Sequence, residues 1–442
     1  MHKVARIGIA AVLAVGLFLA GAVAITRGGT ETAEPAVAAP DAATLLAPGT
    51  TDSLEDTIAS LQTRLRERPD DWRSFASLGL AYVQQARITA DPSSYPRAEA
   101  ALRRSLDLQT QDNVDAMVGM AALAAARHDF EVALEWGERA RKINPYDASV
   151  YGVIGDAQVE LGRYHDAFAT FQTMVDTRPD LASYARVSYA RELQGDVAGA
   201  IEAMEGAESF AGTPADRAWV AYQLGELSFH AGRLGEAAAH YRRGAQLAPA
   251  YVPPQAGLAR VAWARGDVQG AIDRYLEVTA RYPSPEYVIA LGELYEAAGE
   301  PDLAREQFEL VATIQQLLTV NGVNVDLELS LYEADHGDPA EALATARAEW
   351  DRRRSIHVAD ALAWALHANG RDREAARYAA KALSLGTRDA LFLFHAGMIQ
   401  LRLGDRDAAR TLLADALDTN PFFSIRYSAV ASDTLRSLGG AR

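Results

Sequence analysis

Cysteine is absent from this chain of 442 residues. Its absence excludes disulfides, thiolate metal sites, a catalytic thiol and a lipidated N-terminal cysteine. Basic residues are also in the minority, because 43 Lys and Arg stand against 59 Asp and Glu and give a formal net charge of −16 at pH 7. Such a charge repels phosphate backbones and anionic lipid headgroups. The composition therefore argues against nucleic acid as a partner.

Sequence motifs for catalysis and for metal binding are missing as well. None of the nine histidines belongs to a His-Glu-x-x-His pair, the spacing that places two metal ligands on one face of a helix. The chain has no glycine-rich phosphate loop, no Gly-x-Ser-x-Gly elbow and no acidic calcium loop. No nucleophile, base and orienting group stand together in the sequence. We therefore expect a protein that is not an enzyme and that uses no cofactor and no metal.

What the chain contains instead is a repeat with a period of 34 residues, which separates Pro145 from Pro179 and Pro249 from Pro283. Turn glycines recur at the same spacing or at 33 residues: Gly162 and Gly195, Gly232 and Gly266, Gly266 and Gly299, Gly370 and Gly404. Each period has the pattern of two amphipathic helices joined at a glycine, which tolerates the backbone angles of a tight turn. The period predicts an all-α solenoid, a right-handed superhelix of antiparallel helix pairs.

The repeats fill residues 53–442 and correspond to about ten helix pairs of this length. An amphipathic helix over Leu54–Leu65 is expected to cap the N-terminal end of the stack, and residues 424–438 the C-terminal end. Two segments break the regular spacing. An insertion at residues 88–95 is interpreted as a tolerated surface loop rather than a contact loop. Extra length around residues 315–324 predicts a helix pair that is lengthened or kinked.

The N-terminal segment differs in character from the repeats. An uncharged run of 19 residues, Ile7–Ile25, follows Lys3 and Arg6. Such a run is typical of a membrane anchor or of a signal peptide, and Ala22-Val23-Ala24 offers a cleavage site, so residues 1–26 are assigned to one of these two. Positive charge ahead of the run places the rest of the chain outside the cytoplasm.

Residues 27–52 are rich in Ala, Pro and Thr and show no helical periodicity. This composition predicts a flexible linker between the N-terminal segment and the repeats. The sequence therefore predicts an exported protein. It is membrane-anchored with its body outside the cytoplasm, or secreted or periplasmic if the signal is cleaved.

Three segments carry a resemblance to a known family: Ala76–Ala86 (ASLGLAYVQQA), His357–Ala365 (HVADALAWA) and Leu385–Ala390 (LGTRDA). With these segments and its period, the chain resembles bacterial exported or membrane-anchored tetratricopeptide repeat (TPR) proteins of an uncharacterised subgroup. The resemblance covers nearly all of residues 53–442 and is specific for the fold rather than for a ligand. It implies that the first helix of each pair lines a concave groove.

The resemblance also implies which positions of the first helices face that groove, and these positions mix aromatic with acidic residues. The candidate partner-binding residues are Trp219, Tyr222, Glu226, Phe229, Trp263, Glu293, Glu296, Asp360 and Trp364. Exposed Trp and Tyr are frequent binding anchors, and carboxylates beside them favour a partner with Lys or Arg. The same residue types at helical spacing are also compatible with an ordinary core and a solvated face.

These patterns predict a non-catalytic protein–protein interaction scaffold of the cell envelope that binds a partner segment in its concave groove. The expected partner is a protein or peptide that is basic and compatible with aromatic contacts. The membrane is a further contact if the N-terminal helix is not cleaved. Two alternatives remain open at this stage: a self-associating structural envelope protein, and an envelope enzyme or metal carrier. The oligomeric state is open too.

Overall fold

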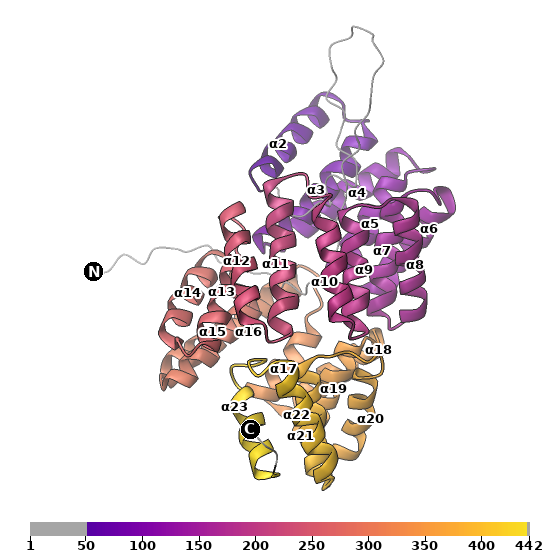
Figure 1. The fold of residues 1–442 in the computed structure, drawn as a ribbon. Coiled ribbons are helices and arrows are strands. Elements are labelled where there is room, and N and C mark those ends of the chain that lie inside the picture. The colour runs from indigo at the N-terminus through magenta and orange to yellow at the C-terminus, as the bar shows by residue number, and fades with distance from the viewer. Residues whose placement is uncertain (1–50, 440–442) are drawn as a thin grey trace, which may run out of the picture.

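The computed structural model describes residues 51–439, which form 22 helices and contain no strand (Figure 1). The prediction of an all-α solenoid is thus confirmed for this part of the chain. The N-terminal segment 1–26 and the linker up to residue 50 lie outside the described residues, so their assignments stay predictions. Among the helices of residues 51–439, none combines the length and the apolar character that crossing a membrane requires.

Ten antiparallel helix pairs, α3 with α4 up to α21 with α22, lie between the single helices α2 and α23. The helices of the N-terminal half are α2 (Thr51–Glu67), α3 (Trp72–Thr89), α4 (Ser94–Leu108), α5 (Val114–Ala126), α6 (Phe130–Ile143), α7 (Ala148–Glu160), α8 (Tyr164–Thr177), α9 (Leu181–Leu193), α10 (Val197–Glu208), α11 (Pro214–His230) and α12 (Leu234–Leu247). The helices of the C-terminal half are α13 (Pro253–Ala264), α14 (Val268–Arg281), α15 (Pro285–Ala298), α16 (Pro301–Val320), α17 (Asp326–His336), α18 (Pro339–Arg352), α19 (Ile356–Ala368), α20 (Asp372–Ala382), α21 (Ala390–Leu403), α22 (Arg406–Thr419) and α23 (Ser428–Ser437).

A glycine in the first helix of a pair receives a large side chain from the second helix. In α7, a Cβ at Gly155 would collide with the ring of Phe171 in α8. In α11, a Cβ at Gly225 would collide with the ring of Tyr241, which is fully buried. The missing side chain lets the two helices approach closely, and the aromatic ring fills the space between them. These contacts explain why a glycine of the first helix and a large residue of the second recur together in several periods.

The connection inside three of the pairs uses a dipeptide of glycine and aspartate. Gly195, Gly266 and Gly404 have φ between +75° and +88°, the left-handed region that costs other residues free energy. The aspartate that follows accepts a hydrogen bond from a backbone N–H in the first turn of the second helix, at Asp196, Asp267 and Asp405. The glycine ends one helix and the aspartate begins the next, so the turn is fixed locally.

The solenoid returns onto itself after one superhelical turn. Figure 1 shows α17 to α23, in orange and yellow, against the lower ends of α7 to α11. Hydrogen bonds join residues that are 192 to 196 positions apart in sequence. The Nδ1 atom of His128 lies 2.6 Å from the Asn324 carbonyl oxygen, and the Tyr164 hydroxyl accepts a bond from the Ile356 N–H at 2.6 Å. We call this contact the seam.

The seam continues through the turns that follow α9 and α11. Thr387 donates to the Leu193 carbonyl, and a Cβ at Gly195 would collide with the backbone of Gly386. A Cβ at Gly232 would lie 3.2 Å from the Thr419 carbonyl oxygen.

The extra length predicted around residues 315–324 contributes to the seam. Helix α16 is extended to 20 residues, and the turn after it brings the Asn324 N–H to 3.2 Å from the Arg127 carbonyl.

The seam predicts different effects for two otherwise similar glycines. Gly195 and Gly266 both have positive φ, at +75° and +84°, but only Gly195 lies against the next superhelical turn, whereas Gly266 has open space around it. We expect Gly266→Ala to lower the free energy of unfolding by about 1 kcal/mol, the strain of a left-handed alanine. Gly195→Ala should cost at least about 1 kcal/mol more, because the added methyl group also pushes Gly386 away. Urea unfolding of the two variants and the wild type measures both values, and equal losses would contradict the seam.

Candidate functional site

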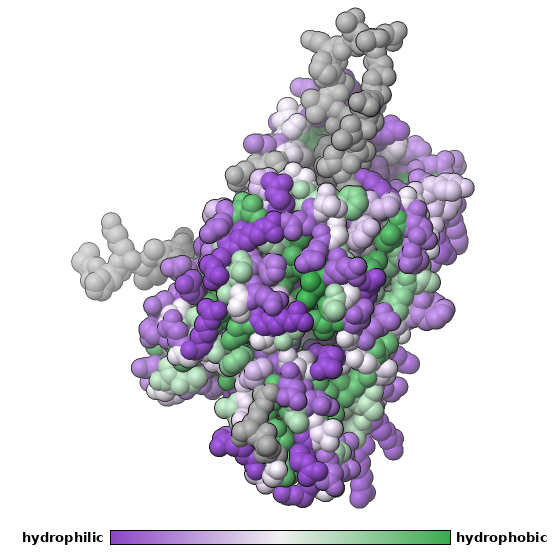
Figure 2. Space-filling model, in the orientation of Figure 1, coloured by the Kyte–Doolittle hydropathy of each residue, from purple (hydrophilic) through white to green (hydrophobic). Residues whose placement is uncertain are grey.

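The seam encloses the concave face of the solenoid as a cavity of about 1270 Å³. The first helices of all ten pairs contribute to its wall, and so does the loop between α22 and α23 with Phe422 and Phe423. Nine of the seventeen tyrosines line it, together with two tryptophans and five phenylalanines. By contrast, hydrophilic residues dominate the outer face shown in Figure 2, with apolar residues in the furrows between them. The cavity wall is therefore rich in aromatic side chains.

Negative charge is in excess on the cavity wall. Among the described residues, eleven carboxylates and five arginines line the cavity, and no lysine does. The carboxylates are Asp156, Glu160, Glu192, Asp196, Glu226, Glu286, Glu293, Glu328, Asp335, Asp389 and Asp418. With neutral histidines the wall therefore has a formal charge of −6. The field inside favours a cationic ligand over an anionic one.

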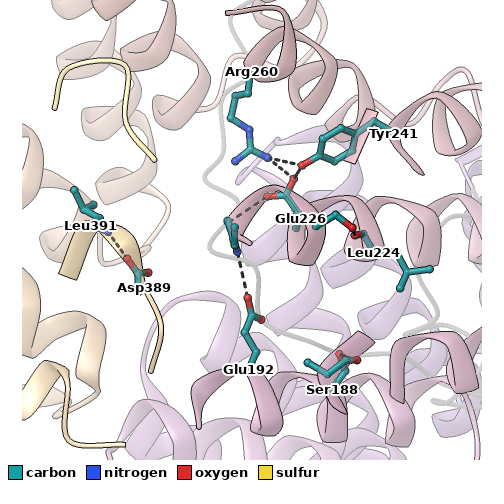
Figure 3. Close-up of polar contacts among 11 residues, drawn as sticks. Ser188, Glu192, Leu224, Glu226, Tyr241, Arg260, Asp389 and Leu391 are labelled. Carbon is teal, nitrogen blue, oxygen red and sulfur yellow. Dashed lines mark hydrogen bonds and ion pairs between the residues drawn. The ribbon is translucent and has the colours of Figure 1, made fainter. Parts of the chain in front are cut away.

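Equivalent positions of successive first helices place charged groups next to one another. Asp156, Glu226, Arg260 and Glu293 each lie six residues before the left-handed glycine that ends their pair's first helix. In Figure 3, Arg260 and Tyr241 converge on the carboxylate of Glu226. The Tyr241 hydroxyl donates to Glu226 at 2.6 Å, and Arg260 forms an ion pair with the same carboxylate. The negative charge of Glu226 is thereby compensated within the protein.

A histidine connects this group to the preceding pair. The Nδ1 atom of His230 lies 3.2 Å from Glu192 Oε1, and its Nε2 atom lies 3.9 Å from Glu226 Oε2. Burial alone would lower the pKa of His230, but the hydrogen bond to Glu192 and the charges of both carboxylates raise it overall. Burial would likewise raise the pKa of Glu226, but Arg260 and His230 lower it overall. Glu226 therefore holds its charge beside a cation.

Two further arginines are buried next to the cavity and neutralise other carboxylates. Arg186 binds Asp156 through two hydrogen bonds of 2.7 and 2.9 Å, yet burial still raises the pKa of Asp156 to about 6. Arg353 follows α18 and binds Glu160 of α7 across the seam at 2.6 Å. It also forms an ion pair with Glu349. The side chains of Arg353, Glu160 and Glu349 are each at most 4% exposed, so these charges depend on one another.

A family model described as tetratricopeptide repeat matches residues 93–148, 153–217 and 257–316. A second model with the same description matches residues 392–422. Over these ranges the chain consists of tetratricopeptide repeats. No curated protein matches it in sequence.

Solved structures that are similar to this TPR protein share little sequence identity with it. The APC/C hetero-tetramer Cut9-Hcn1 is 14% identical, with 87% of this chain and 93% of that chain covered and a TM-score of 0.37. Pseudomonas aeruginosa pilF is 19% identical, with 49% and 94% covered and a TM-score of 0.36. The human IFIT1 dimer with PPP-AAAA is 12% identical, with 83% and 87% covered and a TM-score of 0.44. At these identities and scores, none of the three indicates a function for the TPR protein.

Six of the nine residues that the sequence analysis singled out line the cavity: Trp219, Tyr222, Glu226, Phe229, Trp263 and Glu293. They do not all present free surface to a partner, because Trp219 is 8% exposed and Phe229 is 3% exposed. Tyr222 and Trp263 are half-buried, and Glu293 lies 3.3 Å from the Nε2 atom of His336. The expected contribution of Glu226 to charge selection needs correction, since Arg260 already compensates its charge.

The other three candidates lie away from the cavity wall. Glu296 is exposed and forms an ion pair with Arg426 at 3.2 Å. Asp360 is 2% exposed and lies 2.9 Å from the Nδ1 atom of His395. Trp364 is 7% exposed, and its indole N–H donates to Asp335 at 2.6 Å. Asp360 and Trp364 hold neighbouring helices together instead of facing open space.

Several cavity residues were missed from the sequence. Tyr251, Tyr282, Glu286 and Glu328 line the wall but lie in loops or near helix starts, outside the helix positions considered. The only signal for them is the density of tyrosine just before and within α15. Within the described residues, no group of three His, Asp or Glu residues is arranged to hold a metal ion.

Proposed function

We propose that this TPR protein is a non-catalytic scaffold of the cell envelope that binds a basic segment of another protein in its enclosed cavity. Tetratricopeptide repeats generally serve protein–protein interaction, which supports the class of function. The observation that carries the proposal is the cavity wall, which combines sixteen aromatic residues with a surplus of carboxylates. Aromatic side chains supply most of the energy at protein interfaces, and the negative field selects basic partners.

The size of the cavity supports a segment of protein over a small metabolite. Pockets for small molecules typically measure about 300–1000 Å³, and this cavity reaches about 1270 Å³. Its wall extends over all ten helix pairs, as an extended segment would need. The envelope location is supported by the uncharged run Ile7–Ile25 behind Lys3 and Arg6, which is typical of an exported or membrane-anchored chain.

Capture of host envelope proteins on the immobilised full chain tests this function. We expect Trp263→Ala to lose the captured partner, with affinity reduced at least about tenfold, because half-buried aromatic residues on the cavity wall act as anchors. Tyr146→Ala is the matched control, since this aromatic residue is 86% exposed and lies outside the cavity. Urea unfolding of both variants excludes a general loss of structure.

The two possible patterns have different meanings. A partner that binds the wild type and Tyr146→Ala but not Trp263→Ala supports binding in the cavity. If all three proteins retain the same partners, the cavity is not the binding site and the proposal is wrong.

A further inference from the structure

Nine of the eleven carboxylates on the cavity wall have a partner within residues 51–439, and two do not. The arginines and histidines described above compensate Asp156, Glu160, Glu192, Glu226 and Glu293. Hydrogen bonds from backbone N–H groups, an indole or a hydroxyl hold Asp196, Asp335 and Asp389, and Asp418 also has an interaction. Glu286 and Glu328 remain, with neither an ion pair nor a hydrogen bond from another residue of the described chain.

Glu328 lies in the first turn of α17, and both of its carboxylate oxygens are buried without a hydrogen-bond partner in another residue of the described chain. Burial raises its pKa to about 7, and the charges of Glu349 and Glu160 add to this effect against the opposing charge of Arg353. The charge of Arg353 attracts Glu328, but no hydrogen bond joins the two side chains. Glu160 and Glu349 bind the Nη1 and Nε atoms of Arg353, and its Nη2 atom is buried without a hydrogen-bond partner, like both oxygens of Glu328. A buried carboxylate without a partner costs free energy unless a cation or a proton arrives.

Glu286 lies in the first turn of α15 and is exposed to the cavity. Within residues 51–439 no ion pair or hydrogen bond to its carboxylate is present. Burial raises its pKa to about 7, with Glu226 adding to the effect and Arg260 and His230 opposing it. Arg260 is paired with Glu226, so it leaves the Glu286 charge uncompensated.

Tyrosine rings pack together at the start of α15. Ring centroids of Tyr287 lie 6.0 Å from Tyr282 and 6.3 Å from Tyr275. All three rings are at most 6% exposed, so they belong to the packed wall. The carboxylate of Glu286, which is exposed, is the group of this part of the wall that a cation can reach.

We propose that Glu286 and Glu328 are the counter-ions for alkylammonium or guanidinium groups of the ligand in the cavity. The inference rests on the proposed function, because it assigns the recognition of the basic segment to two named carboxylates. The cationic groups come either from Lys and Arg side chains of a bound segment or from a free polyamine. Both sources present the same chemistry to the cavity.

Isothermal titration of the full chain with three probes tests the inference: a tetralysine peptide, spermine and a tetraglutamate peptide. The wild type should bind a cationic probe and not tetraglutamate. The double variant Glu286→Gln with Glu328→Gln should bind the same cationic probe about tenfold or more weakly, because two charges at close range are lost. The matched control is Glu131→Gln with Glu135→Gln, which removes the same charge from exposed positions of α6 outside the cavity.

The pH dependence of cation binding is a second readout, which would not change if Glu286 and Glu328 had only a structural role. A cation binds the ionised carboxylates, and both have a pKa of about 7 in the free protein. Binding should therefore weaken as the pH falls from 8 to 6 and should release protons at pH 7. His230 and His336 line the same wall beside carboxylates, so the double variant, which keeps both histidines, serves as the reference.

Each outcome decides one question. Binding of tetralysine but not spermine identifies a protein segment as the source, and binding of spermine alone identifies a free polyamine. Equal binding by wild type and double variant, or equal loss in the Glu131 and Glu135 control, overturns the inference. If the double variant still captures the envelope partner at full strength while Trp263→Ala does not, the counter-ion role fails and the proposed function stands.

Discussion

Replacing Arg353 with alanine should lower the free energy of unfolding by about 3–5 kcal/mol, since removal of one member of a buried ion pair leaves the other charge unpaired. Arg353 binds Glu160 of α7 and Glu349 of α18, and all three side chains are almost completely buried. Its guanidinium also lies 5.0 Å from the ring centre of Phe130. Arg354→Ala is the control, because this neighbouring arginine is exposed and should cost about 0.5 kcal/mol or less.

Urea unfolding of the two variants at pH 7 measures the difference. A triple variant, Arg353→Met with Glu160→Gln and Glu349→Gln, separates the loss of the charges from the loss of the seam. It should recover much of the stability, because neither Glu160 nor Glu349 is left as a buried charge without a partner. Equal stability of Arg353→Ala and Arg354→Ala would show that α7 and α18 are not joined in this way.

Replacing Glu328 with glutamine should stabilise the protein at pH 8 by up to about 3 kcal/mol. This is the free energy that corresponds to a pKa raised from 4.5 to about 7 in the folded protein. The raised pKa means that the folded protein binds more protons than the unfolded chain between pH 4.5 and 7. The wild type therefore loses stability as the pH rises through this window. The glutamine side chain has no proton to lose there, so the variant keeps this contribution to its stability. The two proteins should be equally stable below pH 4.5 and differ fully above pH 7.

Urea unfolding at pH 5, 6, 7 and 8 follows this divergence. Glu131→Gln, which changes an exposed carboxylate of α6, should track the wild type at every pH. Destabilisation by Glu328→Gln at pH 8 would mean that the carboxylate has a favourable partner, and it would remove one of the two proposed counter-ions. Stabilisation combined with weaker cation binding would instead show that Glu328 serves binding at the expense of stability.

The helix pairs could be predicted from the sequence because their signals are local. A left-handed glycine marks most of the turns and a capping aspartate follows it in several, as at Gly195 and Asp196, and Gly155 with Phe171 shows how one pair packs. These signals act within about 34 residues, the length of one repeat. They define each pair and its neighbours without any knowledge of the rest of the chain.

The seam could not be predicted in the same way. It depends on the small rotation between successive pairs, which accumulates over the 192 to 196 residues that separate its contacts. The register of the first helices brought Tyr222, Trp263 and four other candidates to the cavity wall. It could not show that Arg260 compensates Glu226 or that His395 binds Asp360, because side chains from the next pair make these contacts.

The seam also changes how the molecule should unfold. In an open solenoid each repeat contacts only its neighbours, so the ends fray and stability grows repeat by repeat. Here the turn after α5 is bonded to Asn324, and α7 is bonded to Arg353, so the first and last thirds of the chain support each other directly. Loss of the C-terminal pairs therefore removes contacts from the N-terminal pairs as well. The ring of contacts makes melting a cooperative event of the whole solenoid, in place of a gradual loss from one end.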